Sequence, residues 1–208
     1  ENTNATANLG ERAISVLAAS EKGGLFSAPD MYMEKLVVGP EAAGKVGLDE
    51  PVKNNLTALA KSLDREIRDL VIVVLDRERN EELIVKIREA GARVRLILDG
   101  DLLPGIAACM RGIGLHAVMG IGAAPEGVIT AAGIRCLKGE MQARFWPKNE
   151  AEKIRLKKMG GEEWMEHVPL PYLASDPDEP DPDDSADFYV KQTAENKPFA
   201  SLIVVSGI

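Results

Sequence analysis

Residues 70–101 read LVIVVLDRERNEELIVKIREAGARVRLILDGD and alternate between two kinds of hydrophobic pattern. The segment Leu70–Leu75 is a continuous aliphatic run, which is typical of a strand covered on both faces. Asn80–Ala90 has apolar side chains at helical spacing and is followed by Gly91, a common residue after a helix. Val94–Leu98 is apolar again. This strand–helix–strand order predicts a right-handed crossover within a parallel sheet.

The same alternation continues on both sides of this stretch. Residues 50–63 have a helical period, with Asp49 as the expected N-cap. The run 36–38, and 13–19 before it, read as strands with turns between them or as a short helix feeding a strand. Further helices and strands are expected in turn at residues 103–110, 115–119, 125–137, 142–146 and 149–159, with a buried strand at 200–205. The pattern predicts an α/β fold of alternating βα units with a mostly parallel sheet.

The composition excludes several classes of protein. The 208 residues are 45% hydrophobic and 28% charged, with 33 acidic and 25 basic side chains and a formal net charge of −8. We expect no nucleic-acid partner, because binding to the phosphate backbone relies on clustered Lys and Arg. We expect no membrane segment, because no apolar run approaches the about 20 residues that span a bilayer. Cys109 and Cys136 lie in separate apolar stretches and are expected to be core thiols in a reducing compartment.

Three features outside the alternating pattern have simpler interpretations. Residues 175–187, SDPDEPDPDDSAD, lack the spacing and the glycine of an EF-hand, so a solvated loop is favoured over a calcium site. His116 and His167 have no zinc-ligand spacing, and a structural role is expected for His116. Since the chain starts at Glu1 without Met and ends directly after an apolar run, we expect it to be a segment of a longer protein.

Three polar stretches follow predicted strands, where ligands collect in open α/β sheets. In Asp76–Arg79, the two arginines match phosphate oxygens, although each alone is more often a solvated charge or a partner of a neighbouring acid. Asp99–Asp101 offers paired carboxylates for sugar hydroxyls or Mg²⁺, or Asp101 simply caps the next helix. In Gly120–Gly127, glycines permit close backbone approach to an anion, and Glu126 is a metal ligand or a favourable first-turn acid.

These stretches together point to one kind of ligand, a phosphorylated and hydroxylated small molecule bound with a divalent metal ion. Segments Ser27–Leu36 (SAPDMYMEKL), Asp99–Asp101 and Gly120–Ala132 (GIGAAPEGVITAA) resemble class II fructose-1,6-bisphosphatase, including its cyanobacterial members. The likeness covers residues 1–146. It implies the layered α/β fold of the lithium-sensitive inositol and fructose phosphatases. Residues 1–48 would then be the end of a first αβ half with part of the metal motif, and residues 49–208 the second αβ half.

The resemblance also implies a set of site residues. Glu1 and Glu126 fall on metal-binding positions for Mg²⁺ or Mn²⁺, and Thr3 on the threonine that helps to activate the attacking water. Catalytic positions are therefore Thr3 and Glu126. Substrate-contacting positions are Glu1, Asn2, Thr3, Tyr32, Arg77, Glu78, Arg79, Asp99, Gly100, Asp101 and Ala123.

The implied activity is metal-dependent hydrolysis of the 1-phosphate of fructose 1,6-bisphosphate, and of sedoheptulose 1,7-bisphosphate as a second substrate, in gluconeogenesis or the Calvin cycle. A homo-oligomer, dimer or tetramer, is expected in the cytoplasm or in a plastid stroma. Asn2 stands where the family motif has glycine, and the motif aspartate would precede Glu1. Two alternatives therefore stay open, a non-catalytic sugar-phosphate-binding or regulatory homologue and a related inositol-type phosphatase.

Overall fold

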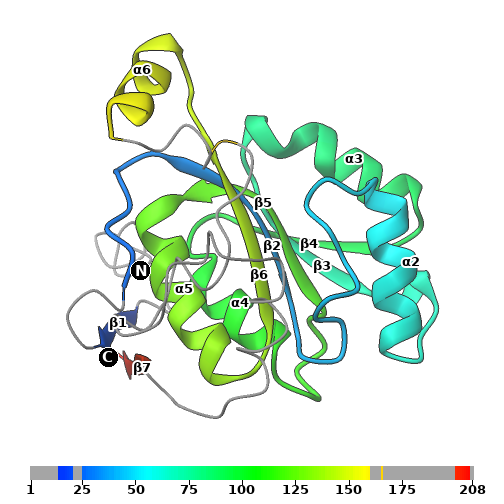
Figure 1. Ribbon diagram of the computed structural model, residues 1–208. Helices are drawn as coiled ribbons and strands as arrows, with labels where there is room; N and C mark the ends of the chain where they lie inside the picture. Colours follow the sequence, from blue (N-terminus) through cyan, green and yellow to red (C-terminus); the bar gives the residue numbers. More distant parts are fainter. Residues whose placement is uncertain (1–13, 21–24, 160–164, 166–199, 207–208) are drawn as a thin grey trace.

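The computed structural model describes residues 14–20, 25–159, 165 and 200–206. Its centre is a five-stranded sheet with helices on both faces, in the strand order β4-β3-β5-β2-β6 (Figure 1). The strands are β2 (Tyr32–Val38), β3 (Val71–Leu75), β4 (Arg93–Ile97), β5 (Ala117–Ala123) and β6 (Glu140–Trp146). The helices of the described ranges are α2 (Val52–Ser62), α3 (Glu81–Glu89), α4 (Leu102–Ala108), α5 (Ala124–Cys136) and α6 (Glu150–Lys158). The predicted α/β fold is confirmed.

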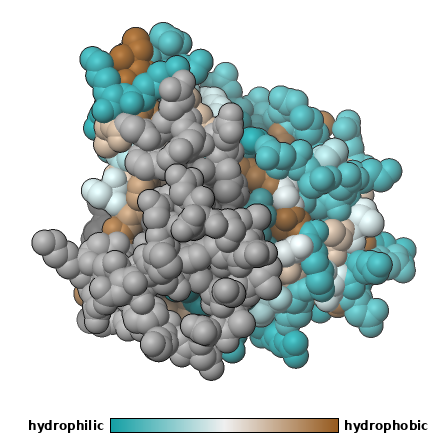
Figure 2. Space-filling view, in the orientation of Figure 1, coloured by the Kyte–Doolittle hydropathy of each residue, from teal (hydrophilic) through white to brown (hydrophobic). Residues whose placement is uncertain are grey.

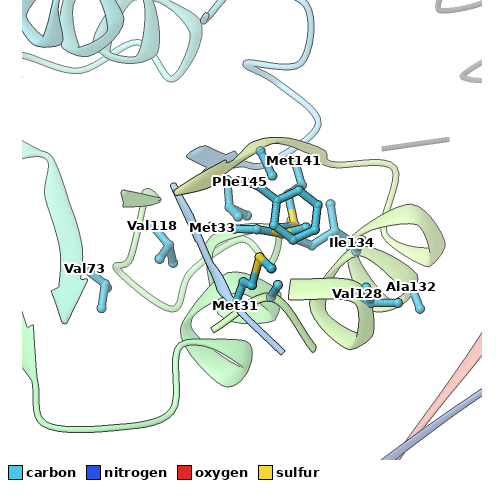
Figure 3. Packing of buried hydrophobic residues seen from close by; sticks show 14 of the residues in the cluster. Met31, Met33, Val73, Val118, Val128, Ala132, Ile134, Met141 and Phe145 are labelled. Atoms are coloured by element: carbon cyan, nitrogen blue, oxygen red, sulfur yellow. The ribbon is translucent and has the colours of Figure 1, made fainter. Parts of the chain in front are cut away.

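The sheet separates two hydrophobic cores, because successive side chains of a strand point to opposite faces. On one face, Ile72 and Val74 pack with side chains of α2 and α3. On the other face, Val73 packs with Met33 and with side chains of α5, and Figure 3 shows this second core. Ile72, Val73 and Val74 are 0% exposed. The prediction that this aliphatic run is a strand covered on both faces is therefore confirmed.

Strand β2 runs against its neighbours. The strand β3 is parallel to both β4 and β5, whereas β2 is antiparallel to both β5 and β6. All strands of this sheet except β2 therefore share one direction, and the sheet is mostly parallel. The reversal has a consequence for the ligand end of the sheet, because it places the first residue of β2, Tyr32, beside the carboxyl ends of β5 and β6.

A separate two-stranded antiparallel sheet joins segments that are far apart in sequence. It pairs β1 (Ile14–Ser20) with β7 (Ala200–Ser206) and lies against α5. A strand was expected at residues 200–205, and of the two interpretations of residues 13–19 the structure shows the strand. The acidic stretch 175–187 and residues 1–13 lie outside the described residues.

The structure differs from the sequence predictions at several boundaries. Helix α2 begins after Pro51 with no side-chain cap, so the prediction that Asp49 is its N-cap is wrong. Asp49 instead accepts a hydrogen bond of 2.5 Å from Arg144. Strand β5 extends to Ala123, so Gly120 and Gly122 lie within a strand and not in a loop after it. Asn149 caps α6, because its side chain accepts a hydrogen bond of 2.9 Å from the backbone N–H of Glu152.

The exposure of one cysteine, Cys136, differs from the sequence prediction. Most of the described surface in Figure 2 is hydrophilic, with a hydrophobic patch at the top of the view, at α6. Ile154 of α6 and its C-cap Met159 are 47% and 46% exposed. Cys109 is buried, but Cys136 is exposed, so the prediction that both thiols are core residues is wrong for Cys136. Within the described ranges, no helix has the length and hydropathy needed to cross a bilayer.

Candidate active site

One end of the main sheet brings together the sequence-predicted residues that the structure describes. In the pairing register, Tyr32 stands opposite Ala123 of β5 on one side and opposite Trp146 of β6 on the other. The segment Asp76–Arg79 follows β3, and Asp99–Asp101 follows β4, at the same end of the sheet. Helix α5, which carries Glu126 in its first turn, starts directly after Ala123. Residues Glu1, Asn2 and Thr3 lie outside the described residues.

The two arginines after β3 hydrogen-bond to backbone carbonyl groups and not to acids. Arg77 donates from Nη1 to the carbonyl of Asp76 at 2.8 Å and from Nη2 to that of Leu98 at 2.5 Å. Arg79 donates from Nε to the carbonyl of Ile121 at 3.1 Å. Within the described part of the chain, neither arginine forms a salt bridge. A carbonyl group orients a guanidinium without neutralising its charge, so both arginines remain available to an anion.

The guanidinium of Arg79 also lies against an aromatic ring. Its central carbon is 4.1 Å from the ring centre of Tyr32, which is a cation–π contact. Tyr32 is in turn 6.4 Å from Trp146, measured between ring centres. Glu78 is exposed in the short 3-10 helix that carries Arg79. Arg79 and Tyr32 therefore face the same space at this end of the sheet.

Asn80 joins this segment to β5 and was not singled out from the sequence. Its side-chain oxygen accepts from the backbone N–H of Ile121 at 2.8 Å, and its amide donates to the carbonyls of Leu75 at 3.1 Å and Ile121 at 3.3 Å. Asn80 is 1% exposed. Gly120 is adjacent, with a φ of +120°, and a Cβ there would lie 2.8 Å from the Asn80 oxygen. Gly120 is therefore needed for backbone conformation and for close approach of Asn80.

A buried ion pair underlies the turn after β4. The ammonium nitrogen of Lys35 on β2 lies 2.5 Å from Oδ2 of Asp101, and the two residues are 3% and 8% exposed. Lys35 also donates to the carbonyl of Ala123 at 3.1 Å. Asp101 occupies the N-cap position of α4, but its side chain makes no capping hydrogen bond there. The ion pair, and not helix capping, therefore determines the position of this carboxylate.

The second glycine of β5 makes room for this pair. A Cβ at Gly122 would lie 2.4 Å from Oδ2 of Asp101 and 2.9 Å from Nζ of Lys35, closer than side-chain carbons approach other atoms. Within the described residues, Gly120 and Gly122 both admit side chains of neighbouring elements. The approach of their backbone to an anion stays a prediction. A lysine between the buried residues Met33 and Val37 on β2 was the sequence signal that could have revealed the pair.

The turn itself is closed locally. Asp99 is half-buried, and its Oδ1 accepts from the backbone N–H of Gly100 at 3.1 Å. Gly100 has a φ of +75°, in the left-handed region that favours glycine. Asp99, Gly100 and Asp101 thus form a tight turn. It is held by the ion pair of Asp101 with Lys35 and by the hydrogen bond from Arg77 to the carbonyl of Leu98, the residue before Asp99.

Glu126 is the described residue for which the family resemblance predicts a metal-binding role. It is half-buried in the first turn of α5, and Pro125 precedes it at the helix start. Its carboxylate is a hard oxygen donor of the kind that Mg²⁺ and Mn²⁺ prefer. Within the described ranges, no three His, Cys, Asp or Glu side chains come together as a metal cluster. Glu126 therefore fits a divalent cation as one ligand of a larger set.

His116 and Cys109 have structural roles away from this end of the sheet. Nδ1 of His116 accepts from the backbone N–H of Val71 at 2.9 Å, as expected for a structural histidine. Burial, followed by the charge of Arg65, lowers the pKa of His116 below its usual value. Burial raises the pKa of Cys109 to about 12, so this thiol is not a nucleophile.

Comparison with known proteins agrees with the resemblance seen in the sequence. Residues 1–178 match the family described as "Bacterial fructose-1,6-bisphosphatase, glpX-encoded". Three similar proteins bear the name D-fructose 1,6-bisphosphatase class 2/sedoheptulose 1,7-bisphosphatase. That of Synechococcus sp. (strain JA-3-3Ab) is 56% identical over 70% of this chain and 42% of its own length. Those of Gloeobacter violaceus and Synechocystis sp. (strain ATCC 27184) are 52% and 54% identical, over 70% and 75% of this chain and 42% and 45% of their own lengths.

The chain thus spans somewhat less than half the length of the curated relatives that it matches. The family match covers most of the chain, including Tyr32, both arginines after β3, the turn after β4 and Glu126. The chain therefore belongs to the family of bacterial, glpX-encoded fructose-1,6-bisphosphatases.

Proposed function

We propose that this protein hydrolyses the 1-phosphate of fructose 1,6-bisphosphate with the help of Mg²⁺ or Mn²⁺. The observation that supports it best is a sheet end where Arg77 and Arg79 have no acidic partner among the described residues and where the Asp99–Asp101 turn ends the neighbouring strand. Free guanidinium groups favour an anion with several oxygens. The names of the relatives support a sugar bisphosphate as that anion.

Each residue has a proposed part in the reaction. Tyr32, Arg77 and Arg79 hold phosphate oxygens, and Asp99 accepts a hydrogen bond from a sugar hydroxyl. Asp101 acts through the shape of the turn, because its Oδ2 is engaged by Lys35. Glu78, Gly100, Asn2 and the backbone of Ala123 line the sugar.

Glu1 and Glu126 would hold the metal ion, which supplies charge neutralisation at the phosphoryl oxygens and a more acidic bound water. Thr3 orients the attacking water. The water oxygen bonds to phosphorus, the bond from phosphorus to the C1 oxygen breaks, and that oxygen takes up a proton. The products are fructose 6-phosphate and inorganic phosphate. Holding the sugar and its phosphates in one orientation keeps the attack in line with the leaving oxygen.

The test is release of inorganic phosphate from fructose 1,6-bisphosphate by the full-length protein with Mg²⁺ or Mn²⁺. We expect turnover, and we expect Glu126→Gln to abolish it while the unfolding temperature changes little, because Glu126 is half-buried and glutamine has nearly the same shape as glutamate. Normal turnover in Glu126→Gln would contradict its assignment. Tight bisphosphate binding without phosphate release would indicate the non-catalytic alternative, and faster release from inositol phosphates would indicate the related phosphatase.

The same resemblance supports three accompanying proposals, namely sedoheptulose 1,7-bisphosphate as a second substrate, a homodimer or homotetramer, and a cytoplasmic location. Phosphate release from the seven-carbon bisphosphate tests the first proposal. Light scattering of the full-length protein tests the second, and fractionation of cells tests the third.

A further inference from the structure

A second cation, Lys148, lies against the ring of Tyr32. The ammonium nitrogen of Lys148 is 4.0 Å from the ring centre of Tyr32, and the central guanidinium carbon of Arg79 is 4.1 Å from the same point. The two cations are therefore no more than about 8 Å apart. They reach the ring from opposite sides of β2, since Arg79 is hydrogen-bonded to β5 and Lys148 follows β6, and β5 and β6 are the two neighbours of β2.

The backbone around Lys148 is held in place. Lys148 lies in the short connection between the end of β6 and α6, which stands at the top of Figure 1. Its N–H donates to the Glu152 carboxylate at 2.8 Å, while the N–H of Glu152 donates to the side chain of Asn149 at 2.9 Å. This reciprocal pair closes the first turn of α6. These two hydrogen bonds therefore hold the main chain from which the Lys148 side chain extends.

The charge on Lys148 is not neutralised within the part of the chain that the structure describes. Lys148 is exposed and forms no salt bridge there. Arg79 is half-buried, forms no salt bridge there either, and is bonded to a backbone carbonyl. Arg79 and Lys148 lie within about 8 Å of each other at the ring of Tyr32, and two cations this close favour an anion with several oxygens. Phosphate oxygens accept charge-assisted hydrogen bonds at about 2.8 Å from nitrogen, so a phosphate at the edge of the ring can reach both the fork of Arg79 and the flexible stem of Lys148.

We propose that Lys148 is a substrate-binding residue that, with Arg79 and Tyr32, holds the phosphate that does not react. This inference rests on the proposed function. The reacting phosphate belongs near Glu126, in the first turn of α5. Arg79 precedes α3, which covers the other face of the sheet, so this pair of cations serves the second phosphate. Arg79 supplies a planar fork and Lys148 a point charge on a flexible stem.

The test compares Lys148→Met with Lys153→Met in the full-length protein. Lys153 is a matched control, because it is an exposed lysine on α6 whose salt bridge within the described residues is with nearby Glu150, at 3.9 Å. We expect Lys148→Met to raise the KM for fructose 1,6-bisphosphate about tenfold, the loss of one charge-assisted hydrogen bond, with kcat within about twofold of wild type. Lys153→Met should leave both unchanged, and Lys148→Arg should restore most of the affinity.

A calorimetric titration with fructose 1,6-bisphosphate keeps this test separate from the proposed function. If the wild type binds the bisphosphate but releases no phosphate, the proposed function fails, and the titration of Lys148→Met still decides the role of the lysine. An unchanged KM and an unchanged dissociation constant in Lys148→Met would overturn the inference while leaving the hydrolase assignment intact. A loss of kcat alone would also overturn it, because a residue that only binds the second phosphate acts mainly on KM.

Discussion

At the scale of single residues, the most informative position is Lys35. It is a charged side chain among apolar neighbours on β2, it is 3% exposed, and it contacts both Asp101 and the carbonyl of Ala123. A buried charge is costly unless it is paired, and removal of one partner leaves the other unpaired. Lys35 therefore ties together two segments whose residues are proposed to contact the substrate, the turn after β4 and the end of β5.

The first prediction concerns this pair. Lys35→Met should lower the free energy of unfolding by about 3 to 5 kcal/mol, because the Asp101 carboxylate would remain buried without its partner. Urea denaturation measures the change. The double variant Lys35→Met/Asp101→Leu should be more stable than Lys35→Met, since no unpaired charge remains. A double variant less stable than the single one would show that the ion pair is not the cause.

The second prediction concerns the glycine that admits the pair. Gly122→Ala should destabilise the protein by about 1 to 3 kcal/mol, the usual range for overpacking, because the new Cβ would lie 2.4 Å from Asp101 Oδ2. Gly127→Ala in helix α5 is the matched control, since its Cβ would lie 3.4 Å from the end of the flexible Met141 side chain of β6. That control should be neutral or slightly stabilising, because alanine favours a helix. Equal effects of the two substitutions would contradict the steric explanation.

At the scale of elements, the end of the sheet depends on side chains that join one element to another. Asn80 connects the start of α3 to β3 and β5, and His116 connects the start of β5 to the start of β3. On the opposite side of β2, Arg144 of β6 donates to Glu34 of β2 at 2.6 Å. Each of these bonds keeps neighbouring elements in register at or near the end of a strand.

The third prediction concerns Asn80. Asn80→Ala should lower the free energy of unfolding by about 1 to 3 kcal/mol, because the buried N–H of Ile121 loses its acceptor. Thermal unfolding measures this loss. The same variant should raise the KM for the sugar bisphosphate, since Arg79 is the preceding residue and is bonded to the same carbonyl of Ile121. An Asn80→Ala protein with wild-type stability would contradict the role of these bonds.

The fourth prediction concerns the pH dependence of stability through His116. Its pKa is lowered in the folded protein, chiefly by burial and then by Arg65, with Arg93 acting in the same direction and the charge of Asp69 opposing. The unfolded chain therefore binds a proton at higher pH than the folded one. The contribution to stability is complete above about pH 6.5 and is lost as the pH falls through the folded pKa. Urea denaturation between pH 5 and pH 8 should show this slope in the wild type and a smaller slope in His116→Gln.

At the scale of the whole molecule, the two faces of the sheet are covered by separate cores, and the site lies at the sheet end between them. This arrangement keeps the polar groups of the site on strand ends and helix starts that both cores hold rigid. The exposed hydrophobic patch of α6 and the proposed substrate-binding Lys148 both belong to the segment that follows β6.

The fifth prediction uses the two thiols to report on the unfolding of the whole molecule. In the native protein, a thiol reagent should modify Cys136, which is exposed, and spare Cys109, which is buried and has its pKa raised to about 12 by desolvation. Both should react in denaturant. Because Cys109 donates to the carbonyl of Val38 at the end of β2, its modification should follow the global unfolding transition. Rapid native labelling of Cys109 would contradict this packing.

The sequence alone determined the kinds of element and their order. Runs such as Leu70–Leu75 and the helical period of 81–89 are local patterns, and local patterns report which faces are buried. The family resemblance, carried by SAPDMYMEKL and GIGAAPEG, also came from the sequence. Only the tertiary structure placed β2 antiparallel between β5 and β6, because strand pairing depends on residues far apart in the chain. For the same reason the purpose of Gly120 and Gly122 became visible only once their neighbours Asn80, Lys35 and Asp101 were in place.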